Sequence, residues 1–185
     1  MHIKQPIRTI LILIASLIAI QLINSLTQGL ISSFGIFPRN IDGLIGIPFA
    51  PWIHHSWQHL FSNAAPLSVL AFVVLQQGQK QFILVWLFIS SIAGSAVWLL
   101  ANEGYHAGAS LMVFGLIGYI ISHAIFSRQF FYILLALIIC FLYAGVILSL
   151  TQLVPGVSWS SHFFGFIAGL LAGKVFANSP KKQSI

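Results

Sequence analysis

Three segments of the sequence carry polar residues inside long apolar stretches. Polar side chains are costly there and mark functional sites. His59 and Asn63 are four residues apart, so on a helix they share one face. Ser110 and His162 each lie near the start of a later apolar stretch. A serine hydroxyl beside an imidazole can attack a carbonyl, because the histidine takes the hydroxyl proton. These residue types predict acyl transfer, with His59, Asn63 and free helix N–H groups as donors to the oxyanion.

Competing hydrolytic chemistries can be tested by counting acidic residues. A zinc protease of the His-Glu-x-x-His type needs a glutamate on a helix, and an aspartyl protease needs two aspartates that share a proton. The chain has one glutamate, Glu103, and one aspartate, Asp42, and both fall in polar connections between apolar stretches. No acid is therefore available to orient His162, and the sequence predicts a serine–histidine dyad instead of a triad.

The composition shows what kind of element must carry these residues. Of the 185 residues, 58% are hydrophobic and 5% are charged, and the mean hydropathy is +0.98. Soluble domains have about 25% charged residues, so lipid must be the solvent for most of this chain. The net charge of +6 comes from scattered basic residues, which does not favour nucleic acid as a partner. The bilayer is the first predicted partner.

A bilayer-spanning helix needs about 20 apolar residues, so the length allows roughly six spans with short connections. We predict a single all-α membrane domain, 1–185, with helices at 9–26, 56–75, 82–100, 108–126, 130–150 and 158–176. The first apolar stretch is too long for the core of a signal peptide, and no small-x-small cleavage site follows it, so we expect a retained helix. The interrupted segment 27–55 is expected to lie in the membrane interface.

Basic residues orient the six predicted helices. Seven of the eight fall on one side when the helices alternate: Lys4, Arg8, Lys80, Arg128, Lys174, Lys181 and Lys182. Arg39, Asp42 and Glu103 fall on the other side. The positive-inside rule therefore predicts that both termini are cytoplasmic (N-in/C-in). The polar residues considered above then lie near the outer ends of their helices.

Glycines at four-residue spacing predict how two of these helices meet. Gly165, Gly169 and Gly173 form a small-xxx-small face, which allows close approach to a neighbouring helix. If that neighbour is helix 108–126, then Ser110 and His162 can touch, because both lie close to their preceding connections.

Other histidines were assigned by position. His55 and His59 are spaced as neighbours on one helix face, but no acidic or cysteine ligand accompanies them, which argues against a metal site. His54 and His106 are expected in the outer interface.

Three segments resemble the rhomboid family of intramembrane serine proteases. Residues 55–63, HSWQHLFSN, match its HxxxHxxxN stretch; residues 108–119, GASLMVFGLIGY, resemble its nucleophile helix; and residues 161–169, SHFFGFIAG, resemble its histidine helix. The resemblance covers nearly the whole chain, with the motifs in the family's order. It implies a six-helix rhomboid-like bundle.

The resemblance implies Ser110 as nucleophile, His162 as general base and acid, and His59 with Asn63 as oxyanion stabilisers. Phe114 matches an aromatic residue that packs against the catalytic histidine. The implied activity is cleavage of proteins that carry a transmembrane helix, without a metal or cofactor. We expect a multi-pass protein of a bacterial cytoplasmic membrane whose active site opens to the outer face.

One departure from the family pattern keeps a second function open. The usual motif is Gly-x-Ser-Gly, but Leu111 follows Ser110 here, and its branched side chain could narrow substrate approach or move the helix start. The alternative is a non-proteolytic rhomboid-like protein that binds or escorts membrane helices. A small transporter is disfavoured, because no buried charge or pair of broken helices marks a midplane site. Natural substrate and oligomeric state stay open.

Overall fold

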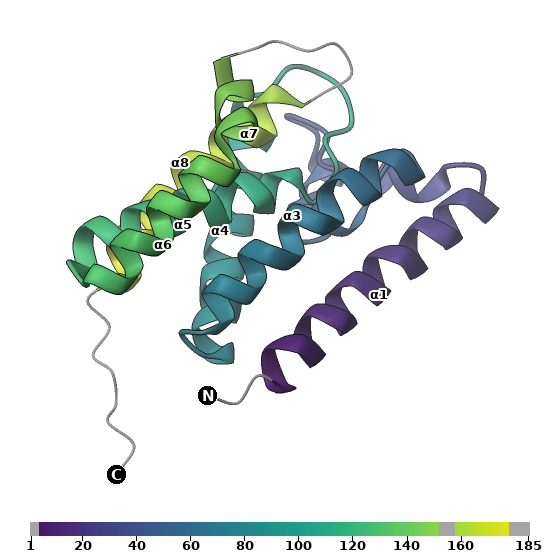
Figure 1. The fold of residues 1–185 in the computed structure, drawn as a ribbon. Helices are drawn as coiled ribbons and strands as arrows, with labels where there is room; N and C mark the ends of the chain where they lie inside the picture. Colours follow the sequence, from purple (N-terminus) through teal and green to yellow (C-terminus); the bar gives the residue numbers. More distant parts are fainter. Residues whose placement is uncertain (1–3, 152–157, 178–185) are drawn as a thin grey trace.

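The computed structural model describes residues 4–151 and 158–177, and its regular structure there is helical. The long helices are α1 (Lys4–Leu26), α3 (Trp57–Leu75), α4 (Gln79–Leu100), α5 (Ser110–Ser127), α6 (Phe130–Leu142) and α8 (Trp159–Ala177). Short elements connect them: η1 (Leu30–Phe34), η2 (Ile41–Ile45), α2 (Gly46–Phe49), η3 (Ala50–Trp52), α7 (Ala144–Leu148) and η4 (Ser149–Thr151). Figure 1 shows these helices as one bundle.

In the described part of the chain, five helices are long and apolar enough to cross a membrane by themselves. A sixth candidate is the pair Phe130–Leu142 and Ala144–Thr151, which is bent by 70°. The chain is thus an all-α bundle of the expected class, but the prediction of one continuous helix over 130–150 is wrong. Its correction is a break at Tyr143, whose backbone (φ −107°, ψ 18°) leaves the helical region.

Helix starts also differ from the predicted boundaries. The helix α3 begins at Trp57, because the hydroxyl of Ser56 accepts the His59 backbone N–H as an N-cap. His55 therefore precedes α3. The spacing had predicted that His55 shares a helix face with His59, and this is wrong, because His55 lies outside the helix. The helix α5 begins at Ser110 and not at residue 108. The nucleophile candidate is thus the first residue of its helix.

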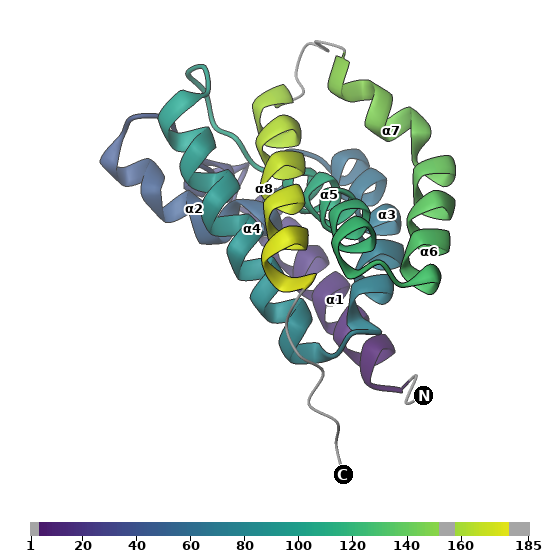
Figure 2. The same cartoon turned by 90° about the vertical axis from the view of Figure 1, so that its left-hand side faces the viewer.

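The helix α5 is the centre of the bundle. It contacts α3, α4, α6 and α8, and Figure 2 shows these helices around it. Its sequence is apolar on all sides, which is typical of a helix enclosed by others. Most of its side chains are buried, including those of Leu116, Ile117 and Tyr119.

The helices α5 and α8 pack with their backbones in contact. A Cβ atom added to Gly169 would lie 1.9 Å from the carbonyl oxygen of Gly115, and one added to Gly165 would lie 2.4 Å from that of Leu111. Gly173 is equally tight against α5, where an added Cβ would be 2.5 Å from that of Ser122. The glycine face therefore packs on α5, as predicted.

The segment between α1 and α3 folds against the C-terminal half of α4. A Cβ on Gly94 would meet the Ile47 side chain at 2.8 Å, and the Ser90 hydroxyl donates to the Ile47 carbonyl at 2.9 Å. An isolated antiparallel bridge joins Ile36 to His106. This bridge connects the segment to the approach to α5. The location of segment 27–55 in the membrane interface stays a prediction.

Candidate active site

Ser110 is buried at the start of α5, with 7% of its surface exposed. The first N–H groups of a helix have no intrahelical acceptor and form the positive end of its dipole, so this position favours a negative charge. Gly108 precedes it with φ +128°, a conformation that L side chains rarely adopt. The chain thus turns sharply into the helix at this point.

The imidazole of His59 lies directly against this turn. A Cβ added to Gly108 would be 2.7 Å from Cε1 and 3.0 Å from Nε2 of His59, and 3.6 Å from the hydroxyl oxygen of Ser110. The His59 ring and the Ser110 hydroxyl thus both border the space beside Gly108. A side chain there would collide with the His59 ring, so this position needs glycine for its space as well as its conformation.

Asn63, one turn further along α3, is buried with 7% of its surface exposed. Its Nδ2 atom is fully enclosed and has no hydrogen-bond partner. A buried donor without an acceptor costs about 1–3 kcal/mol, so such groups call for an explanation. The Asn63 amide is therefore a free hydrogen-bond donor inside the bundle.

His162 comes to the same region from α8. Its ring stacks on that of Phe114, with centroids 4.2 Å apart and an interplanar angle of 23°. Phe114 is one turn below Ser110 on α5, so the packing of an aromatic residue against His162 is as the resemblance implied. Within the described residues, no hydrogen bond joins Ser110 to His162. Hydrogen bonds between catalytic groups are often long in apo structures and tighten with substrate.

His54 has a structural place that sequence reasoning missed. Its side chain is completely buried within the protein. The expected depth of His54, in the outer interface, stays a prediction. The backbone N–H of Ala109 donates to its Nε2 atom at 3.1 Å, which puts the proton on Nδ1, 3.3 Å from the carbonyl oxygen of Trp52. Burial, with a further contribution from the neighbouring His59, lowers the pKa of His54 to about 4. A neutral His54 therefore holds the residue before Ser110.

His106 links the segments that lead into α5 and α8. One ring nitrogen, Nε2, is 2.9 Å from the carbonyl oxygen of Asn102 and must donate to it. The other, Nδ1, is 2.6 Å from the hydroxyl oxygen of Ser158, which precedes α8. Nδ1 then accepts the Ser158 proton. The contact ties the loop before Ser110 to the start of the helix that carries His162.

Leu111 does not narrow the approach to Ser110. Its side chain is 2% exposed and belongs to the hydrophobic core, while its carbonyl faces Gly165. The other expected consequence, a shift of the helix start caused by Leu111, stays a prediction. The leucine therefore fills space within the bundle.

Known proteins are similar to this chain over most of its length. The family model described as Rhomboid domain matches residues 42–179, which span all three motifs. An uncharacterised protein of Mycobacterium tuberculosis is 33% identical over 183 residues, covering 94% of this chain and 76% of its own. An uncharacterised protein of Mycobacterium leprae is 34% identical over 183 residues, covering 94% and 72%. RHOMBOID-like protein 5 of Arabidopsis thaliana is 28% identical over 133 residues, covering 70% of this chain and 43% of its own. This multi-pass membrane protein belongs to the rhomboid family.

Proposed function

We propose that this protein is an intramembrane serine endopeptidase that cleaves proteins carrying a transmembrane helix. One observation carries the proposal: α3, α5 and α8 bring His59, Ser110 and the Phe114–His162 stack to the start of α5. The mycobacterial relatives fit a location in a bacterial cytoplasmic membrane. The site then opens toward the outer face, from which water enters.

The first half of the reaction forms an ester with Ser110. The hydroxyl oxygen attacks the carbonyl carbon of the scissile peptide bond, and His162 takes the hydroxyl proton. The carbonyl oxygen becomes an oxyanion, which the free N–H groups at the start of α5 and the side chains of His59 and Asn63 stabilise. The C–N bond then breaks as His162 gives the proton to the leaving amine.

The second half regenerates the enzyme. Water attacks the ester carbonyl and gives a proton to His162, which returns it to the Ser110 oxygen as the carboxylic acid leaves. No acid orients His162, and the stack on Phe114 does so in its place. A peptide bond within an intact helix is shielded, so the preferred substrates have helices that unwind easily.

The deciding experiment is reconstitution into lipid vesicles with a model substrate that has one transmembrane helix. We expect Ser110→Ala and His162→Ala to lower kcat by at least ~10³-fold. Ser127→Ala, at the other end of α5, is the matched control and should retain activity. Full cleavage by either Ser110→Ala or His162→Ala would disprove the dyad.

The unpaired Asn63 amide allows a separate test of the oxyanion site. Asn63→Ala should lower kcat by about 10²-fold with little change in KM, because the donor acts mainly on the transition state. A fluorophosphonate probe should still label Ser110 in that variant, but more slowly. A wild-type protein that neither cleaves nor reacts with the probe would favour the alternative, a protein that binds or escorts membrane helices.

A further inference from the structure

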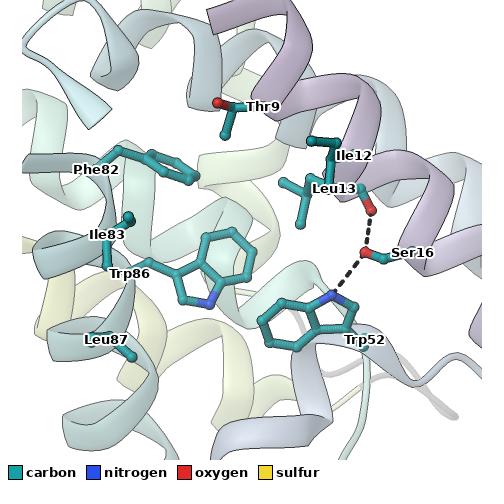
Figure 3. A pocket seen from close by; sticks show the side chains of 9 residues that line it. All are labelled: Thr9, Ile12, Leu13, Ser16, Trp52, Phe82, Ile83, Trp86 and Leu87. Carbon is teal, nitrogen blue, oxygen red and sulfur yellow. Dashed lines mark hydrogen bonds between the residues drawn. The ribbon is translucent and has the colours of Figure 1, made fainter. Parts of the chain in front are cut away.

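A groove lies between α1 and α4, on a different part of the bundle from Ser110. It encloses about 250 Å³ and is lined by Thr9, Ile12, Leu13, Ser16, Trp52, Phe82, Ile83, Trp86 and Leu87. Figure 3 shows these side chains around it. The Trp52 and Trp86 rings pack together at one end, with centroids 5.3 Å apart.

The lining offers few polar partners to water. Its two hydroxyl groups are already used, because Thr9 donates to the Gln5 carbonyl at 3.1 Å and Ser16 donates to the Leu13 carbonyl at 2.6 Å. The Trp52 indole N–H also has a partner, the Ser16 oxygen at 3.0 Å (Figure 3). Bound water needs two to four free polar partners, so this groove suits a hydrocarbon chain.

Basic residues stand below the groove on both helices. Lys4 and Arg8 precede Ile12 at four-residue spacing, so they lie on the same face of α1 as this lining residue. Lys80 precedes Ile83 and Leu87 by three and seven residues on α4, which again is one helix face. Both helices that line the groove thus carry basic residues on the groove side of their first turns.

These two cationic ends are next to each other. The Gln5 side-chain amide donates to that of Gln79 at 2.7 Å, which joins the starts of α1 and α4. The side chains of Lys4, Arg8 and Lys80 are exposed. Both acidic residues of the chain lie elsewhere: Glu103 follows the far end of α4, and Asp42 lies in η2, which packs toward that far end. The positive charge here therefore has no acidic neighbour.

We propose that this groove binds one anionic phospholipid, with an acyl chain between α1 and α4 and the phosphate at Arg8, Lys80 and Lys4. Burial of the acyl chain does not by itself favour one lipid over another, since lipid tails surround the whole protein. The head group decides occupancy, because a basic residue at a membrane surface attracts anionic lipid. The first turn of α4, whose N–H groups are free, adds to the same potential.

The competing explanation is that these cations only orient the protein, as basic residues do in many membrane proteins. The two explanations differ in whether position matters. Arg128 and Lys174 are exposed as well, but they lie at the ends of α5 and α8, away from the groove. A pair of substitutions there removes the same charge without touching the proposed site.

The test titrates the full chain in neutral detergent with phosphatidylglycerol or phosphatidylcholine, and follows the thermal unfolding midpoint and the lipid retained in native mass spectrometry. We expect one retained phosphatidylglycerol, and about thirtyfold weaker binding for Arg8→Gln with Lys80→Gln. Arg128→Gln with Lys174→Gln should stay within about twofold of wild type. Equal losses in both double variants would overturn the proposal, as would equal retention of the two lipids.

A second pair of variants tests the groove itself. It also keeps the proposal testable if the charge variants do not fold. Ile83 lines the groove and is 46% exposed, whereas its neighbour Leu84 is 40% exposed and does not line it. Ile83→Trp should fill the groove and abolish retention of the lipid, and Leu84→Trp should not. Unchanged binding in Ile83→Trp, or equal stabilisation by inorganic phosphate alone, would exclude an acyl chain in this groove.

Discussion

The backbone N–H of Ala109 lies just before the nucleophile candidate, and His54 is its acceptor. His54 is itself held at its carbonyl, which accepts from the Asn24 side chain at 3.0 Å. A chain of contacts thus runs from α1 through a buried imidazole to the first turn of α5. Because the His54 side chain is buried, loss of this acceptor leaves the Ala109 N–H unpaired in a place that water cannot reach.

We therefore predict different outcomes for two substitutions of His54. His54→Leu leaves the Ala109 N–H unpaired and should lower kcat about 10²-fold by displacing Ser110. His54→Gln places an oxygen near the position of Nε2 and should restore most of the rate. Proteoliposome cleavage and fluorophosphonate labelling measure both. Equal activity of the two variants would mean that the acceptor does not position the serine.

The same residue predicts a response of stability to acid. His54 has a pKa of about 4 in the folded protein, against 6.5 as its ordinary value, so the unfolded chain binds its proton more tightly. The free energy of unfolding should therefore fall as pH drops from about 6.5 to about 4, by on the order of 3 kcal/mol. His54→Gln should lose less stability over this range in detergent unfolding. An identical pH profile in the variant would contradict this prediction.

At the scale of helices, α5 and α8 are held in register by glycine. The carbonyl of Gly115 occupies the space that a side chain at Gly169 would need. No larger residue fits unless the helices separate, and separation would move His162 away from Ser110. Packing of this kind lets two backbones approach where the hydrophobic effect between helices is absent.

Gly169→Ala should destabilise the protein by about 3 kcal/mol, as overpacking of a tight core does, and should also reduce cleavage. Gly145→Ala is the matched control, since an added Cβ there meets nothing within 4 Å. That change should be neutral or stabilise α7 by about 0.5–1 kcal/mol. Unfolding in mixed detergent measures both. Similar midpoints for the two variants would show that the α5–α8 contact yields easily.

At the scale of the whole molecule, the basic residues predict that both termini are cytoplasmic. In a Cys140→Ser background, Glu103→Cys should react with a membrane-impermeant maleimide in intact cells. Lys80→Cys should react only after the cells are opened. Labelling of Lys80→Cys in intact cells would reverse the orientation, and the proposed site would then face the cytoplasm.

Ser110, His59, Asn63 and His162 could be chosen from the sequence, because they lie in the three segments that resemble the rhomboid motifs. His54 could not, since the histidine pair at 54–55 shows no difference that distinguishes its members. One is buried and the other exposed only because the segment between α1 and α3 folds back on the bundle. The break at Tyr143 was missed for a similar reason: hydropathy stays high through the bend.

Local patterns determined the membrane class, the candidate spans, the expected orientation and the glycine face, because hydropathy and helical period depend only on neighbouring residues. Tertiary structure decided which helices meet, where α5 begins, and that a buried imidazole accepts the N–H of the residue before Ser110. It also placed a groove above basic residues of two helices separated by more than fifty residues. Contacts of this kind depend on packing between distant segments, which no local pattern records.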